Sequence, residues 1–142
     1  MSKKIYIAGK WSEKEKLQKK MLELIALNHT ITHDWTRFEA DPNNSFQSMA
    51  DHDVNGVIEA DIYIGIMDDD KYAYRGTFTE LGVALATQKI CPDHKIYIVC
   101  PSFFTDKKGY CTTNCFFHSS GIEHISSWEN MLELLGGRGT KK

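Results

Sequence analysis

Residues 62–67, with the sequence IYIGIM, are followed by the acidic triplet 68–70 and then by residues 75–82, with the sequence RGTFTELG. The apolar, β-branched run is typical of a buried strand, and the pattern after Gly76 predicts a helix over residues 77–89. In open α/β sheets the loop between such a strand and such a helix faces the ligand cleft, beyond the carboxyl ends of the strands. This stretch therefore indicates both the class of fold and the place of a site.

Glu80 is the carboxylate of this stretch. Near a helix N-terminus, unsatisfied N–H groups favour the ionised form of a carboxyl group, and an ionised carboxylate at the lip of a pocket can act as a nucleophile. Thr77 and Glu80 also fit the capping-box pattern, in which the glutamate binds the N–H of the cap residue and does no chemistry. The pattern by itself leaves both interpretations open.

Strands and helices alternate along the rest of the chain. We expect strands over residues 4–9, 30–35, 61–67, 95–100 and 122–125, and helices after Ser12 and over residues 46–59, 77–89 and 127–135. This alternation requires a parallel sheet with right-handed crossovers. We predict one α/β domain over residues 1–135, doubly wound with about five strands and helices on both faces, and a disordered tail over residues 136–142.

Two of the expected helices carry apolar residues that should face the core. The stripe of the first helix consists of Leu17, Met21, Leu22, Leu24 and Ile25, and that of the second consists of Met49, Val54, Val57 and Ile58. Residues 102–121 form a long aromatic segment without clear periodicity, which is typical of a functional or mobile loop.

The charge balance excludes several classes of partner. A net charge of -2 at pH 7 gives no reason to expect binding to nucleic acid or to an anionic membrane surface. No apolar run approaches the roughly 20 residues of a membrane span, and the N-terminal residues lack a signal-peptide core. We therefore expect a cytoplasmic protein with reduced thiols.

Cofactor motifs are missing or incomplete. Cys111, Cys115 and His118 lack the paired spacing of zinc sites, so no metal site is expected. Gly9 stands alone where a dinucleotide-binding fingerprint needs three glycines, although Asp34 has the place of a ribose-binding acid. The phosphate-binding P-loop pattern is also absent.

Four segments, in this order along the chain, resemble the nucleoside 2-deoxyribosyltransferase family. They are residues 4–9 (KIYIAG), 32–36 (THDWT), 53–61 (DVNGVIEAD) and 76–84 (GTFTELGVA), and the resemblance extends from residue 4 to about residue 99. The ordered set favours a catalytic Glu80 over a capping Glu80. The resemblance implies a flavodoxin-like fold, no metal or organic cofactor, and assembly as a homodimer or a larger homo-oligomer.

The resemblance also implies a reaction. Family enzymes cleave the bond between a base and C1′ of deoxyribose and pass the sugar to another base, so the expected partners are a nucleoside or nucleotide and a free base. Glu80 matches the family's nucleophile, Asp53 the aspartate that handles the base, and Tyr6 the tyrosine that orients the nucleophile. These residue types suit the chemistry, because a carboxylate stabilises positive charge on the sugar while an acid protonates the leaving base.

Each of these residues also has a purely structural interpretation: Tyr6 as a core side chain, Asp53 as a solvated helix acid. The remaining expected substrate-binding residues are Gly9, Asp34, Trp35, Tyr74, Arg75, Gly76 and Thr77. Tyr74 has the place nearest to that of a second base-binding aspartate in the family.

Two further functions stay open. Arg75 and Thr77 match positions at which relatives that hydrolyse nucleoside 5′-monophosphates hold phosphate, although Arg75 is also close enough in sequence to pair with the acidic residues 68–70. The alternative of another class is a non-catalytic nucleotide-binding module, in which Glu80 only caps a helix.

Overall fold

The computed structural model describes residues 2–40, 45–101 and 108–136, with the backbone alone for residues 38–40. Within these ranges five parallel strands form one sheet in the order β2-β1-β3-β4-β5. The strands are β1 (Lys4–Ala8), β2 (Thr30–Ile31), β3 (Ile62–Ile66), β4 (Lys95–Val99) and β5 (Ile122–Ile125). This is the flavodoxin-like strand order, so the predicted α/β class and parallel sheet are confirmed.

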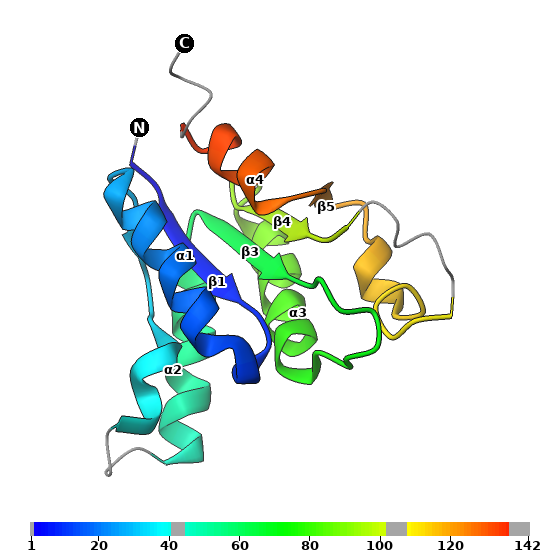
Figure 1. The fold of residues 1–142 in the computed structure, drawn as a ribbon, viewed down its shortest axis with the longest axis horizontal. Helices are drawn as coiled ribbons and strands as arrows, with labels where there is room; N and C mark the ends of the chain where they lie inside the picture. Colours follow the sequence, from blue (N-terminus) through cyan, green and yellow to red (C-terminus); the bar gives the residue numbers. More distant parts are fainter. Residues whose placement is uncertain (1, 41–44, 102–107, 137–142) are drawn as a thin grey trace.

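Helices cover both faces of the sheet (Figure 1). The α-helices of the described residues are α1 (Lys14–Ala26), α2 (Phe46–Glu59), α3 (Arg75–Ile90) and α4 (Trp128–Leu134), and the 3-10 helices are η1 (Trp11–Glu13), η2 (Trp35–Ala40) and η3 (Cys115–His118). Helices α1 and α4 lie on one face, where Trp128 Nε1 donates a hydrogen bond to Glu23 Oε1 at 2.8 Å. Helices α2 and α3 pack together on the other face.

Strand β3 lies at the centre of the sheet, and all five of its residues are buried. A strand covered on both faces needs apolar residues at every position, which explains the continuous run IYIGI. Tyr63 of this strand stacks on Tyr6 of β1, with ring centroids 6.1 Å apart. Its hydroxyl donates a hydrogen bond to the Thr77 carbonyl at 2.8 Å, which ties the start of α3 to the centre of the sheet.

Several predicted element bounds are wrong in an informative way. Strand β2 ends at Ile31 rather than residue 35, because the chain turns at Asp34 and enters η2 at Trp35. Helix α1 begins at Lys14 after a 3-10 turn, and its N-cap is Glu13, so Ser12 is not the cap. Ser127 does cap α4, since its side chain accepts a hydrogen bond from the Asn130 N–H at 3.1 Å.

The buried stripes of α1 and α2 are narrower than predicted. Leu17, Met21 and Leu24 are buried on α1 and Val57 on α2, while Met49 is half-buried. The exposed fractions of the other predicted core residues are 53% for Leu22, 49% for Ile25, 37% for Val54 and 50% for Ile58. Each helix contacts the sheet through a single line of side chains, so the apolar residues on either side of that line stay exposed.

Three predictions fall wholly or partly outside the described residues: the polar loop at 41–44, residues 102–107 of the long aromatic segment, and all but Gly136 of the expected tail. Of the helices that the structure describes, none is long and apolar enough to cross a bilayer.

Candidate active site

A pocket of about 180 Å³ opens at the carboxyl ends of β1 and β3, next to the start of α3. This is the edge at which open α/β sheets bind their ligands. Its walls come from segments far apart in sequence: Gly9, Trp11, Trp35, Met49, Asp53, Tyr72, Tyr74, Arg75, Gly76, Thr77 and Glu80. Most of the site residues expected from the sequence therefore meet here.

The structure brings the three expected catalytic residues together. The Tyr6 hydroxyl, on β1, donates a hydrogen bond to Glu80 Oε2, on α3, at 3.0 Å. The Asp53 carboxyl group, on α2, faces the same pocket and acts on the charge of Glu80. A carboxyl pair of this kind, facing a pocket, is suited to hold one proton and one negative charge at once.

Burial sets the charge of this pair. Burial, reinforced by the neighbouring Asp53, raises the pKa of Glu80 to about 8, and burial also raises the pKa of Asp53. The pair therefore shares one proton at neutral pH. The hydrogen bond from Tyr6 favours the ionised form of either carboxyl group, but burial and the charge of Asp53 outweigh it at Glu80, whose pKa stays raised.

The helix terminus does not determine the ionisation of Glu80, contrary to the prediction from sequence. Helix α3 begins at Arg75, so Glu80 lies in its second turn, where the effect of the helix dipole has faded. The capping box is absent as well: Tyr74 is the N-cap residue, and Glu80 binds Tyr6 instead of a cap N–H.

The start of α3 is fixed against β1 through Thr77 and Gly9. The Thr77 hydroxyl donates a hydrogen bond to the Gly9 carbonyl at 3.3 Å. A Cβ atom at Gly9 would lie 2.8 Å from Leu17 Cδ1, so the chain leaves β1 here with no room for a side chain. Both residues line the pocket, and their contact holds the floor of the site in place.

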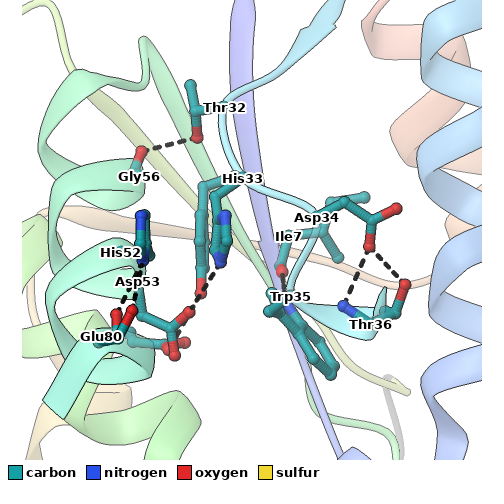
Figure 2. A network of polar contacts seen from close by, with 12 residues as sticks. Ile7, Thr32, His33, Asp34, Trp35, Thr36, His52, Asp53, Gly56 and Glu80 are labelled. Carbon is teal, nitrogen blue, oxygen red and sulfur yellow. Dashed lines mark hydrogen bonds and ion pairs between the residues drawn. The ribbon is translucent and has the colours of Figure 1, made fainter. Parts of the chain in front are cut away.

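Aromatic rings form two sides of the pocket. The Trp35 indole N–H donates a hydrogen bond to the Ile7 carbonyl at 2.7 Å (Figure 2), and the Trp11 ring lies 5.7 Å from the Trp35 ring. On the other side, Tyr72 and Tyr74 meet edge to face at 4.8 Å. Flat rings at a cleft suit the stacking of a planar base.

Trp11, Met49 and Tyr72 were not among the site residues expected from the sequence, although all three line the pocket. The available signal was the place of Trp11, three residues beyond the end of β1, at the sheet edge where ligands bind. No local pattern distinguishes Met49 or Tyr72 from ordinary surface or core residues.

Tyr74 and Arg75 have different surroundings. Tyr74, at a left-handed φ of 51°, is buried, and its hydroxyl binds Asp68 Oδ1 at 3.3 Å and the Asp69 N–H at 3.1 Å. Asp69 pairs with Lys10 Nζ at 2.8 Å. Within the part of the chain that the structure describes, Arg75 makes no ion pair with the acidic residues 68–70, and it remains exposed at the pocket.

Asp34 does not face the pocket. Its carboxylate accepts hydrogen bonds from the Thr36 N–H at 3.0 Å, from the Thr36 hydroxyl, and from Arg37 Nε at 3.0 Å (Figure 2). Burial would raise the pKa of Asp34, but the hydrogen bonds from Thr36 and Arg37 outweigh burial and lower it. The geometry makes Asp34 an anchor of the turn after β2.

Helix α2 approaches the sheet closely next to the carboxyl pair. Thr32 Oγ1 donates a hydrogen bond to the Gly56 carbonyl at 2.7 Å, and a Cβ atom at Gly56 would lie 2.9 Å from His33 Cβ and 3.0 Å from Tyr6 Cδ1. The absent side chain at Gly56 therefore lets α2 place Asp53, one turn earlier, beside Glu80.

The chain is an α/β protein with a flavodoxin-like sheet, and a tyrosine and two carboxyl groups meet at the edge where such sheets bind ligands. The model of the family described as nucleoside 2-deoxyribosyltransferase matches residues 5–118. The chain belongs to this family.

Two solved structures are similar to the chain. One is a CMP N-glycosidase from Clostridium botulinum, with 18% identity, a TM-score of 0.60, and coverage of 93% of this chain and 96% of that chain. The other is a conserved protein from Enterococcus faecalis V583, with 17% identity, a TM-score of 0.64, and coverage of 94% and 96%. At these identities the likeness supports the fold. A comparison with curated proteins gives no match.

Proposed function

We propose that the protein cleaves the N-glycosidic bond of a nucleoside or nucleotide, with Glu80 as the nucleophile and Asp53 as the acid. The observation that carries this proposal is the hydrogen bond from Tyr6 to Glu80, with the Asp53 carboxyl group beside it, in a pocket with aromatic sides. Membership of a family of deoxyribosyltransferases supports it.

The proposed chemistry uses one proton and one carboxylate. As the bond between C1′ and the base breaks, its electron pair goes to the base nitrogen, and the proton of Asp53 goes to the base. The Glu80 carboxylate stabilises positive charge on the sugar and forms a bond to C1′. Tyr6 holds the Glu80 carboxylate in place through its hydroxyl. Asp53 is left ionised, ready to accept a proton from the next reactant.

The second half of the reaction decides the class of enzyme. In a transferase, a second base gives its proton to Asp53 and displaces Glu80 from C1′. In a hydrolase, a water molecule gives its proton to Asp53 and displaces Glu80 from C1′. We propose transfer to another base as the reaction, because the family model describes transferases.

One observation favours a second candidate, a nucleoside 5′-monophosphate N-glycosidase. Arg75 is exposed at the pocket, and among the described residues it makes no ion pair with residues 68–70, so its guanidinium could bind a phosphate. It lies with Gly76 and Thr77 in the first turn of α3, where N–H groups attract anions. The similar structure from C. botulinum is a CMP N-glycosidase.

Turnover tests the main proposal. The protein is incubated with deoxynucleosides and a different free base, and the products are separated by chromatography. We expect exchanged nucleoside with the wild type and none with Glu80→Ala, at a loss of several orders of magnitude in rate. If no exchanged nucleoside and no free base forms from any nucleoside or monophosphate, the protein is a nucleotide-binding module.

The 5′ end is tested with Arg75→Ala. We compare kcat/KM for a deoxynucleoside and for its 5′-monophosphate in the wild type and the variant. The nucleoside is expected to be the better substrate, with little change in Arg75→Ala. A preference for the monophosphate that Arg75→Ala alone removes would identify a nucleotide hydrolase.

We further propose that the protein forms a homo-oligomer, as the family resemblance implies. Helix α2 carries an apolar stripe at four-residue intervals, here called the α2 stripe: Phe46, Ala50, Val54 and Ile58. All four are exposed, with an exposed fraction of 90% at Phe46. Rows at this spacing pack against the same rows of a second helix, so a second copy of the chain fits this face.

A further inference from the structure

His33 lies two residues after the end of β2, beside the carboxyl groups of Asp53 and Glu80. The proposed reaction does not use it. Its Nε2 atom is 3.5 Å from Asp53 Oδ1 and is shielded from solvent. Figure 2 shows the two side chains facing each other, His33 from the segment after β2 and Asp53 from α2. Because both groups are half-buried, a charge on the imidazole acts on Asp53 with little screening.

The packing of α2 sets this distance. The hydrogen bond from Thr32 Oγ1 to the Gly56 carbonyl fixes α2 to the segment that carries His33. His52, one residue before Asp53, stacks on the His33 ring with centroids 5.4 Å apart and planes within 20°. The His33 ring therefore packs against α2 through His52, and this packing keeps it close to Asp53.

The charged and titratable groups around His33 come from three elements. Asp53 and His52 face it from α2, Asp34 from its own segment and Tyr6 from β1, with Glu80 of α3 beyond Asp53. Burial lowers the pKa of His33 more than the nearby Asp53 carboxyl raises it. At neutral pH the imidazole is consequently uncharged, so it does not hold Asp53 in the ionised form.

We infer that His33 is a positioning residue whose charge decides which carboxyl group of the pair holds the shared proton. This inference rests on the proposed roles of Glu80 and Asp53. When His33 takes up a proton from solvent, the imidazolium stabilises a carboxylate on Asp53, and the shared proton is then confined to Glu80. The pair keeps one proton throughout. The nucleophile is then neutral and the leaving base has no proton donor, so the enzyme is inactive at low pH.

The pH dependence of kcat/KM tests this directly, with the wild type, His33→Gln and the control His118→Gln, an exposed histidine outside the pocket. In the wild type we expect activity to fall on the acid side as His33 becomes charged. In His33→Gln that fall moves to lower pH while activity near pH 8 is kept, and His118→Gln follows the wild type. An unchanged acid side in His33→Gln, or an equal loss at every pH, would overturn the inference.

A second measurement needs no turnover. Carboxyl-carbon NMR signals of Asp53 and Glu80 are followed while His33 is titrated in the wild type. We expect the Asp53 signal to move toward the ionised form and the Glu80 signal toward the protonated form as His33 gains its proton. We also expect His33 to titrate at lower pH in Asp53→Asn, which lacks the carboxylate that stabilises its cation. Carboxyl signals that do not respond to His33 overturn the inference, whereas these opposite shifts without turnover overturn the proposed function alone.

Discussion

At the scale of single residues, Glu80 lies between groups with opposite effects on its charge. Tyr6 stabilises the carboxylate through a hydrogen bond, while burial and the Asp53 carboxyl disfavour it. The balance raises the pKa of Glu80 to about 8, from an ordinary value of 4.5. A carboxyl group that is costly to ionise also makes the folded state less stable as the pH rises toward its raised pKa.

This cost predicts a pH-dependent gain in stability for Glu80→Gln. Because the folded pKa of Glu80 is raised, its favourable contribution is present below about pH 4.5 and is lost as the pH rises toward about 8. Glutamine mimics the protonated form at every pH. We expect Glu80→Gln to be more stable than the wild type at pH 8, by on the order of 1 kcal/mol, with a smaller difference at pH 4.5.

Urea unfolding at several pH values measures this difference. Glu129→Gln, on the exposed surface of α4, serves as the matched control for replacing a glutamate by glutamine. A stability difference for Glu80→Gln that does not depend on pH would contradict the assignment of a raised pKa to Glu80.

Asp53→Asn separates acid catalysis from structure. An asparagine cannot protonate the leaving base, so we expect cleavage of natural nucleosides to slow by roughly 10²- to 10⁴-fold. Substrates whose leaving base is already acidic should lose much less, because they need little protonation in the transition state. The check is kcat for a series of leaving groups, and an equal loss across the series would point to a role in binding or folding.

At the scale of elements, the position of α2 decides the geometry of the site. Gly56 is the point of closest approach, since its missing Cβ leaves room for His33 and Tyr6. The same helix carries Asp53 into the pocket one turn earlier. Contacts between α2 and β1 therefore affect the stability of the protein and the geometry of the pocket together.

Gly56→Ala is expected to lower both stability and activity. The added methyl would lie 2.9 Å from His33 Cβ, and overpacking of this kind costs about 1–3 kcal/mol, reduced by up to about 1 kcal/mol of helix propensity. Gly82→Ala on α3 is the control: a Cβ there meets nothing within 4 Å, so we expect it to stabilise the protein by about 0.5–1 kcal/mol. Melting temperature and kcat are measured for both. A Gly56→Ala variant as active as the wild type would show that α2 can shift without moving Asp53.

At the scale of the whole molecule, the exposed apolar residues are unevenly placed. The α2 stripe continues along the length of its helix, from Phe46 to Ile58. On α1, Leu22 and Ile25 are also exposed, but they stand among lysines and glutamates. A continuous apolar row is what a contact between two copies requires.

We therefore expect a mass of at least two chains in light scattering, and a single chain after Val54→Glu combined with Ile58→Glu. Charges buried in such a contact would have no partners, which disfavours association strongly. Leu22→Glu combined with Ile25→Glu is the matched control and should keep the wild-type mass. A wild type that is monomeric at all concentrations would contradict the proposed oligomer.

The sequence by itself determined the architecture. The buried runs of β1, β3 and β4 and the alternation of strands and helices are local patterns, and they predict a parallel sheet with helices on both faces. Helix α2 and strand β5 were predicted with the bounds that the structure has. The ordered motifs also selected Tyr6, Asp53 and Glu80 as one group of residues.

Only the tertiary structure decided how charged groups meet. Tyr6 and Glu80 are 74 positions apart, and no local pattern shows that their hydrogen bond is 3.0 Å long. Asp34 turned away from the pocket because Thr36 and Arg37 bind it, and His33 came to lie beside Asp53 because Gly56 lets α2 approach. Burial and charge depend on neighbours that are remote in sequence. The protonation of Glu80 and the narrow buried stripes of α1 and α2 therefore follow from packing. Periodicity along the chain shows only which helices and strands form.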